Sequence, residues 1–456
     1  MYSFEKFNKN LFRTNGERNV GYMKKLRIGN FHVKDIVFGE KTSFKNGVLI
    51  VNKEEALDCL DPGKELKNLQ LHIVRPGDST RILPCKVAVE PRFRPDGRST
   101  FPGLIGPLAA CGDGDLYAMK GTSVISCGKY AQSSDGMLDM SGPGAEHSFF
   151  AKMVNLVVYA ELINPINIDQ PFRNETPLKL AAHFLAEYVA KTLAGQNPED
   201  WETYELESGT TEAEKKGLPR VIYFSQMRGQ VGRDKCFNDR IFGNDVENML
   251  PVLVHPNAVF DGQIASFGGL YGDGFYTYAY QNQPVLKRLY KEHGKTINFL
   301  GIVFWACDSA DKVKQTAKIT CGELADILKA DGAIVHSTAG GSNYDIDFFY
   351  TVAELEDRGI KTVGFTAEHN GKTMLDPKGD AIVTGGESGT IFEFPPMDLV
   401  IGDIGSVVRD FYHAAWTVHD KYGPSLRPDG SLIVNGCMIV DSTNNCAFTT
   451  KTAKDF

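Results

Sequence analysis

Apolar and polar residues follow different periodicities in the two halves of the chain. Up to about residue 165, apolar residues recur at every second position, as in Leu26 and Ile28, which is typical of strands. The dipeptide Asn46-Gly47, followed by the apolar residues Val48–Val51, predicts a tight hairpin turn. From residue 220 onward, short apolar runs, of which Arg220–Phe224 is the first predicted strand, alternate with stretches of helical spacing. The second half therefore reads as repeated strand–helix units.

The clearest of these units lies between residues 331 and 371. Gly332–Ser337 predicts a buried strand, and Thr338–Asn343 (TAGGSN) is a short glycine-containing loop. Helical spacing begins at Asp345, and Ile360–Phe365 predicts a second strand. Strand, loop, helix and strand make a βαβ unit. Ligands of open α/β sheets bind at the carboxyl ends of such strands, beside helix N-termini.

We therefore predict an α/β protein with a β-rich N-terminal domain followed by a mostly parallel, doubly wound sheet. The expected boundaries are an extension over 1–23, a β-rich domain over 24–165, a helix and linker over 166–219, and an α/β domain with glycine-rich loops over 220–456. Thr176–Leu193 is the clearest helix of the first half, with Asn174 or Thr176 expected to cap it. The aromatic stretch Phe275–Tyr280 alternates as a strand does.

Composition narrows the function classes. A net charge of −8 over 456 residues argues against nucleic-acid binding, which needs a basic surface. No apolar run reaches the roughly 18 residues that cross a membrane, and the N-terminus has no signal-peptide pattern. The nine cysteines include no C-x-x-C pair, and no H-E-x-x-H motif is present, so we predict no metal site. We expect a cytoplasmic protein that binds neither nucleic acid nor membrane.

Two glycine-containing loops that follow predicted strands are candidate substrate-binding sites. Their candidate residues are Thr338, Gly340, Gly341, Ser342 and Asn343 in the first loop, and Gly386, Glu387 and Ser388 in the second. Backbone N–H groups at a helix start suit a carboxylate or a phosphate. Neither loop matches a dinucleotide-binding or Walker pattern, so no nucleotide is predicted. The alternative, that both are plain strand-to-helix turns, stays open.

Other polar residues are expected at the same edge of the predicted sheet. Glu368 and His369 end the strand that follows the first loop, although spacing alone does not show that they meet Thr338. His336 lies inside a predicted strand and is expected to be a core histidine with a satisfied partner.

Beyond these local patterns, the chain resembles the proprotein subunit of component B of the glycine, sarcosine and betaine reductases, to which a D-proline reductase subunit is related. The resemblance extends from Leu26 to the end of the chain. It rests on VFGEKTSFKNGVLIVN (37–52), VRPGDSTRI (74–82), FPG (101–103), LAACGDGDLYAMKGTSVISCGK (108–129), LDMSGP (138–143), VLKRLYKEHGKTINFLGIV (285–303) and FPPMDLVIG (394–402).

The resemblance implies a reductive C–N cleavage. In the family, a selenol or thiol of a partner subunit attacks the α-carbon of a small amino acid or betaine, and the amine leaves. It therefore implies an oxidoreductase subunit of a hetero-oligomer, active only with a partner that carries the thiol or selenol. A non-catalytic scaffold or substrate-binding subunit of such a complex is the alternative.

The resemblance also implies a prosthetic group that this chain is expected to lack. In the family, an internal cysteine of the proprotein becomes a pyruvoyl group by self-cleavage, and that group is proposed to hold an amino substrate as a Schiff base. No cysteine occurs from 237 to 306, where the family cysteine should fall. Ser266 is the candidate for a replacement self-processing position. A quaternary ammonium substrate, which cannot form a Schiff base, would fit a chain without the pyruvoyl group.

Overall fold

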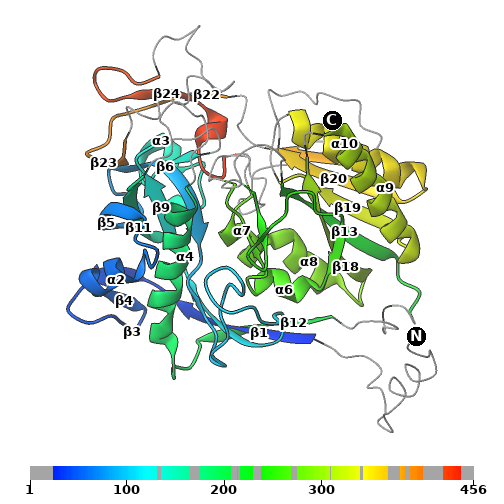
Figure 1. Ribbon diagram of the computed structural model, residues 1–456, viewed down its shortest axis with the longest axis horizontal. Coiled ribbons are helices and arrows are strands. Elements are labelled where there is room, and N and C mark those ends of the chain that lie inside the picture. The colour runs from blue at the N-terminus through cyan, green and yellow to red at the C-terminus, as the bar shows by residue number, and fades with distance from the viewer. Residues whose placement is uncertain are drawn as a thin grey trace, which may run out of the picture.

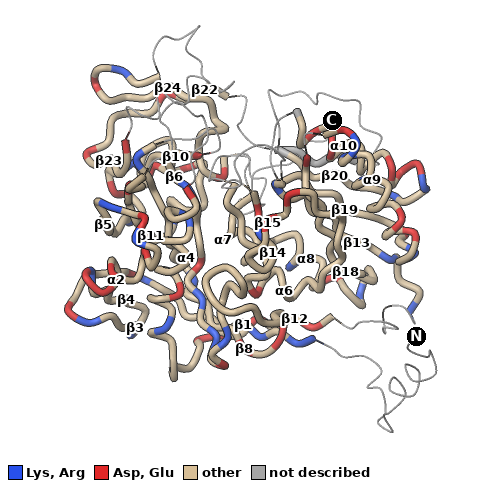
Figure 2. Tube along the Cα trace, in the orientation of Figure 1, with Lys and Arg blue, Asp and Glu red and all other residues tan. Residues whose placement is uncertain are grey.

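The computed structural model describes residues 24–130, 135–164, 175–206, 213, 216–229, 238–268, 275–308, 310–338, 342–367, 381–385, 390–403 and 425–442. Over these residues the chain is a mixed α/β protein (Figure 1). Lysine and arginine are interspersed with aspartate and glutamate along the trace (Figure 2). No helix among the described residues is long and apolar enough to cross a membrane.

Two mixed sheets form most of the first half. The order of the first is β12 (Asp200–Leu206), β1 (Lys24–His32), β8 (Gly114–Lys120) and β7 (Arg92–Phe93), and that of the second is β10 (Gly136–Asp139), β6 (Thr80–Val89), β9 (Thr122–Gly128), β11 (Val154–Leu162) and β5 (Leu66–Val74). Both sheets combine parallel and antiparallel pairs. Inward-facing side chains from both sheets contribute to one large apolar core.

A small sheet extends this half and confirms the predicted hairpin. Its order is β2 (Asp35–Phe38), β4 (Val48–Val51) and β3 (Ser43–Lys45), with β3 and β4 antiparallel. Asn46 and Gly47 both have positive φ, at 53° and 81°, as a two-residue turn of the predicted type requires.

Helices of the first half are α2 (Lys53–Cys59), α3 (Gly142–Ala145) and α4 (Thr176–Ala190), with 3₁₀ turns at Phe150–Lys152 and Lys191–Leu193. The expected α4 helix is confirmed, but the cap predicted at Thr176 is wrong. Glu175 precedes the helix without a side-chain capping bond, because its carboxylate pairs with buried Lys86 at 2.7 Å. Asn174 lies outside the described residues.

The second half is organised around one six-stranded sheet. Its order is β16 (Val252–Val254), β18 (Asn298–Cys307), β13 (Arg220–Arg228), β19 (Gly332–His336), β20 (Lys361–Ala367) and β21 (Ala381–Gly385). The strands from β18 to β21 are parallel, and β16 pairs antiparallel with β18. The predicted βαβ unit is β19, α10 (Ser342–Asp357) and β20.

Helices cover both faces of this sheet. On one face, Ile222 and Phe224 of β13 pack with α9 (Asp311–Ile327) and α10, and on the other face Tyr223 joins the core that includes α7 (Thr277–Asn282) and α8 (Pro284–Glu292). Figure 1 shows α9 and α10 on the outer side of the sheet and α7 and α8 on the side toward the first half. Because side chains along β13 alternate between the two faces of the sheet, they contribute to two separate apolar cores.

The remaining elements are short. They are α6 (Pro256–Phe260), the strands β14 (Arg240–Ile241), β15 (Asn244–Asp245) and β17 (Ile264–Ala265), the pair β22 (Ile391–Phe394) and β24 (Leu432–Asn435), the strand β23 (Leu399–Gly402), and a 3₁₀ turn at Gly436–Met438. β23 runs parallel to β6, so it extends a sheet of the first half. The domain boundaries given above stay a prediction.

Two expectations need correction. The stretch Phe275–Tyr280 is not a strand, because α7 begins at Thr277 and Phe275 and Tyr276 precede it. All six side chains are buried, so no exposed face existed to reveal the helical period. The doubly wound, mostly parallel sheet predicted for the second half holds only in part: the α/β class is confirmed, but the six-stranded sheet is mixed, since β16 pairs antiparallel with β18.

Candidate functional site

The carboxyl ends of β13, β18 and β19 meet at one edge of the six-stranded sheet. Arg228 at the end of β13 is paired in register with Cys307 at the end of β18, and Ser225 with His336 of β19. Asp308 follows β18 directly, and Ser337 and Thr338 follow β19. Side chains from these strand ends, and from the segments that pack on them, make up the polar edge described below.

Thr338, predicted as a substrate-binding residue, is fully buried at this edge. Its hydroxyl donates to the backbone oxygen of Gln226 at 2.7 Å. Its own carbonyl accepts from the backbone N–H of Phe275 at 2.9 Å and from Nη2 of Arg228 at 3.5 Å. Thr338 therefore holds together β13, β19 and the segment that leads into α7.

Ser266, predicted as the possible self-processing position, lies beside the same segment. Its hydroxyl donates to the carbonyl of Phe275 at 2.8 Å and accepts from the backbone N–H of Gly268 at 3.3 Å. Because Phe275 bonds Thr338 through its N–H and Ser266 through its carbonyl, one residue bridges the two candidates. The structure brings together two residues that were selected for unrelated reasons.

Other predicted residues are placed only in part. Ser342 is the first residue of α10, and the side-chain oxygen of Asn343 accepts from Nζ of Lys314 at 3.5 Å. Gly340, Gly341, Gly386, Glu387, Ser388, Glu368 and His369 lie outside the described residues.

A buried carboxylate beside Arg228 at the end of β13 was missed by sequence reasoning. Asp239 accepts from the backbone N–H of Arg228 at 3.0 Å and from the Tyr280 hydroxyl at 3.2 Å. Burial raises the pKa of Asp239, while the charge of Arg228 and the hydrogen bonds from the Arg228 N–H and the Tyr280 hydroxyl oppose that rise. The predicted strand stopped at Phe224, four residues short of Arg228, and thus excluded this cation.

A second buried network joins the sheet to α10. Asp347 accepts through Oδ2 from the indole N–H of Trp305 at 2.8 Å and from Nε2 of Gln226 at 3.2 Å. The Gln226 side-chain oxygen in turn accepts from the Ser337 hydroxyl at 3.0 Å. Burial raises the pKa of Asp347 to about 7, although the bonds from Gln226 and Trp305 favour its ionised form; the charge of Asp308 adds to the rise.

His336 behaves as the core histidine that was expected. It is buried, and its Nδ1 lies 2.6 Å from the Tyr223 hydroxyl, which also accepts from Nε2 of Gln283 at 2.9 Å. Its ring packs edge-on against Phe275 and Phe365, with centroids 5.3 and 4.7 Å apart. His336 thus packs against Phe275, whose backbone N–H bonds the carbonyl of Thr338.

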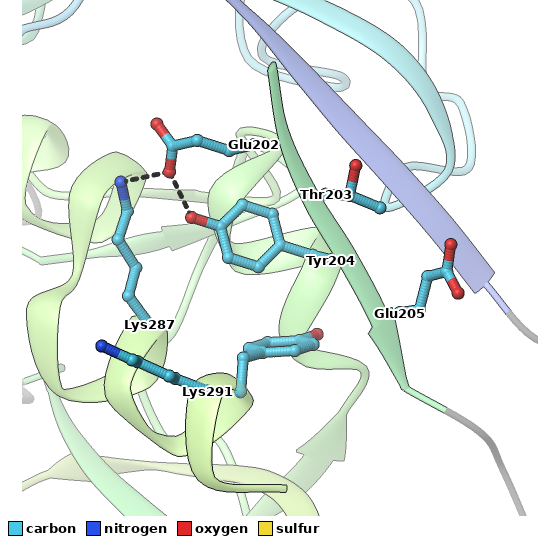
Figure 3. A pocket seen from close by; sticks show the side chains of 7 residues that line it. Glu202, Thr203, Tyr204, Glu205, Lys287 and Lys291 are labelled. Atoms are coloured by element: carbon cyan, nitrogen blue, oxygen red, sulfur yellow. Dashed lines mark hydrogen bonds and ion pairs between the residues drawn. The ribbon is translucent and has the colours of Figure 1, made fainter. Parts of the chain in front are cut away.

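An open pocket of about 560 Å³ lies elsewhere, between β12 and α8 (Figure 3). Two of its charged side chains pair with each other, since Nζ of Lys287 lies 2.7 Å from Oε2 of Glu202. Tyr290 in its wall packs on Phe299, near the amino end of β18. The pocket is therefore at the opposite end of that strand from Asp308, away from the polar edge.

Two buried cysteines of the described chain are not suited to nucleophilic chemistry. Cys127 and Cys307 are fully buried, and burial raises the pKa of both thiols, that of Cys127 to about 12. The thiolate is the reactive form, so neither side chain supplies an attacking sulfur. Within the described ranges, no group of three or more potential ligands is arranged to hold a metal ion.

Comparison with known proteins places this geometry in context. Residues 23–454 match the family model described as glycine/sarcosine/betaine reductase component B subunits. The chain is 39% identical over 443 residues to the betaine reductase complex component B subunit alpha of Peptoclostridium acidaminophilum, covering 95% of this chain and 100% of that protein. It is 33% identical to the glycine reductase complex component B subunits alpha and beta of the same organism, with the same coverage.

A third relative is the sarcosine reductase complex component B subunit alpha of that organism, 29% identical over 92% of this chain and 97% of the relative. No solved structure matches the chain significantly.

Proposed function

This chain belongs to the glycine/sarcosine/betaine reductase component B family, and we propose that it is the substrate-binding subunit of such a component. In this role it holds a small amino acid or betaine while a thiol or selenol of a partner subunit cleaves the C–N bond. The observation that carries the proposal is the match over almost the whole chain, including full-length alignment with a betaine reductase subunit.

The polar edge of the six-stranded sheet is the proposed substrate site. Arg228 supplies a buried cation there, and the start of α10 supplies backbone N–H groups; both suit the carboxylate that glycine, sarcosine and betaine share. Thr338 connects these two features through its bond from Arg228 and its place before α10. A carboxylate bound here leaves the α-carbon and the nitrogen as the variable part of the ligand.

The proposed reaction is a displacement at that α-carbon. A bond forms between carbon and the partner's sulfur or selenium, and the C–N bond breaks with its electron pair leaving on the amine. This chain contributes orientation and exclusion of water rather than a nucleophile. The raised thiol pKa values of Cys127 and Cys307 support a division of labour in which the partner brings the attacking group.

A pyruvoyl group, where a family member carries one, supplies an electrophilic carbonyl to an amino substrate. Residues 237–306 of this chain contain no cysteine to generate it. Ser266 is a poor substitute, because its buried hydroxyl donates to Phe275 and accepts from Gly268 and is thereby held by its own neighbours. We propose that the chain stays uncut and binds its substrate non-covalently, as a betaine requires.

Turnover with the partner subunit tests this proposal. The full chain, copurified with a thiol- or selenol-bearing partner, should convert at least one of glycine, sarcosine and betaine in the presence of a dithiol reductant, and should do so only when both subunits are present. Intact mass should give one species near 50.3 kDa. A complex that forms but converts none of the three substrates would favour the alternative, a non-catalytic scaffold.

A further inference from the structure

Besides Oδ1 of Asp239, two buried carboxylate oxygens at the polar edge have no hydrogen-bond partner among the described residues. These atoms are Oδ1 of Asp347 and Oδ2 of Asp308, on residues that are 0% and 1% exposed. The other oxygen of each is used: Oδ2 of Asp347 by Trp305 and Gln226, and Oδ1 of Asp308 by the backbone N–H of Ala310 at 2.7 Å. Leaving a buried carboxylate oxygen unpaired costs stability, so each one calls for an explanation.

The two carboxylates lie close enough to influence each other. Asp308 follows the last residue of β18, and Asp347 reaches from α10 to side chains of β18 and β13. The charge of Asp308 raises the pKa of Asp347, and both charges act on Cys307 at the strand end. The unpaired oxygens therefore belong to one cluster at the carboxyl end of β18.

Among the described residues, neither Asp308 nor Asp347 forms an ion pair with a lysine or arginine. Asp308, Asp345 and Asp347 all influence the Cys307 thiol, and Lys314 is the cation that opposes them. Nζ of Lys314 bonds the backbone oxygen of Asp308 and the side-chain oxygen of Asn343. It is thus directed at neutral oxygens and pairs with no carboxylate among the described residues. An additional cation would restore the balance.

We propose that Asp347 and Asp308 form the seat for the ammonium end of the substrate. The proposal rests on the function proposed above and adds the residues that would select a positively charged nitrogen. It also gives the bound zwitterion a direction, with the carboxylate toward Arg228 and the nitrogen toward Asp347.

Gln226 explains how one small molecule could reach both ends. Its backbone oxygen accepts from Thr338, whose carbonyl accepts from Arg228, and its side chain donates to Asp347. Gln226 is therefore in contact with residues of both proposed subsites, through its backbone oxygen on one side and its side chain on the other. A zwitterion bound beside Gln226 would present its carboxylate to one subsite and its nitrogen to the other.

An organic cation fits this seat better than a metal ion. Across the described part of the chain, no three ligands are grouped as a metal site requires. An ammonium group needs only carboxylates within about 4–6 Å, where the attraction is strong once water is excluded. The seat therefore has the chemistry to accept a protonated or a methylated amine.

Binding of a charged ligand and its neutral isostere tests the seat. The full chain would be titrated calorimetrically with betaine and with 3,3-dimethylbutanoate, in which carbon replaces the nitrogen. We expect the intact protein to bind betaine at least tenfold more tightly. In Asp347→Asn this preference should fall to less than threefold, while the affinity for 3,3-dimethylbutanoate stays within twofold.

Matched controls separate a local role from a general change in charge. Asp326→Asn removes one carboxylate at the far end of α9, where Asp326 pairs with Arg358, and it should leave the tenfold preference intact. Equal affinities of the intact protein for both ligands would overturn the inference. So would an Asp347→Asn chain that keeps the full preference for betaine.

The outcome also distinguishes this inference from the proposed function. If the function is wrong, the complex with its partner converts no amino acid or betaine, and Asp347 becomes irrelevant. If the function is right and the seat is wrong, the Asp347→Asn complex converts betaine with an unchanged KM. Glycine and sarcosine, run beside betaine, report whether the seat accepts an ammonium with N–H donors.

Discussion

Replacing Asp347 by asparagine should change how the stability of this protein depends on pH. The carboxyl group has a pKa raised from its ordinary 3.8 to about 7 because it is buried. The folded chain therefore holds this proton more tightly than the unfolded chain does. Between about pH 4 and pH 7 the group's contribution to the free energy of unfolding falls as pH rises, and it is constant outside that window.

The size of the effect follows from the shift. About three pKa units at about 1.4 kcal/mol each give an upper limit of roughly 4 kcal/mol for the cost of the ionised carboxylate above pH 7. At pH 5 the same group costs only about 1.6 kcal/mol, because little more than one unit separates pH 5 from the ordinary pKa. Asparagine cannot ionise, and its side-chain oxygen can still accept from Trp305. The stability of the variant relative to the native chain should thus increase by about 2–3 kcal/mol from pH 5 to pH 8.

Denaturant unfolding of both chains at the two pH values measures this difference directly. Other buried acids, such as Asp135, whose burial raises its pKa to about 6, contribute the same slope to both proteins and cancel in the comparison. An Asp347→Asn chain that loses equal stability at pH 5 and pH 8 would refute the reasoning. Saturating betaine should stabilise the native chain more than the variant at pH 8, since the ligand's charge offsets the carboxylate.

Three further changes probe the rest of the molecule. Arg228→Lys keeps the positive charge but loses the planar guanidinium group that can bind both oxygens of a carboxylate. KM for all three substrates should therefore rise about tenfold, while the unfolding free energy stays within about 1 kcal/mol of the native value. An unchanged KM would show that Arg228 does not bind the substrate carboxylate. Ser266→Ala should leave the intact mass at one species near 50.3 kDa and kcat within twofold, whereas two fragments in the native chain and one in the variant would establish self-cleavage. Lys86→Met should lower the unfolding free energy by about 3–5 kcal/mol, because Asp135 and Glu175 would keep buried charges without their shared cation. Urea midpoints of the native chain and the variant at pH 7 check this. An unchanged midpoint would mean that the two carboxyl groups are not charged in the folded chain.

Sequence periodicity predicted the strands and helices best where one face of an element differs from the other. β13 was predicted from Arg220 to Phe224 because its apolar residues are continuous there, and it was cut short where the strand turns polar at Ser225 and Gln226. The stretch before and within α7 was misread because every side chain from Phe275 to Tyr280 is buried. In both cases tertiary packing, which the local pattern does not contain, decides the element.

The sequence predicted where in the fold the candidate site should lie, at the ends of the strands, but not most of the residues that lie there. Thr338 was found because it follows a strand of a βαβ unit, and the structure confirms that it lies at the strand ends with other polar groups. Its partner Arg228 and the nearby Asp239 were missed, because the bond from the Arg228 N–H to Asp239 joins residues eleven positions apart, which no spacing rule predicts. Position along a strand is local information, whereas the identity of a buried partner is not.

Asp347 could not be predicted from the sequence pattern, yet its buried carboxylate is the most informative group of the candidate site. Asp347 occupies a helical position beside the apolar residues of α10, where an amide would keep a hydrogen bond to Trp305 without the cost of a buried charge. A chain selected for stability alone would favour asparagine there, since the unpaired oxygen of Asp347 gains nothing within the described structure. A buried carboxylate that lowers stability and gains no compensating contact indicates that the residue serves something other than folding. A cationic ligand at the end of β18 is such a reason, and it also gives the unpaired oxygen of Asp308 a partner.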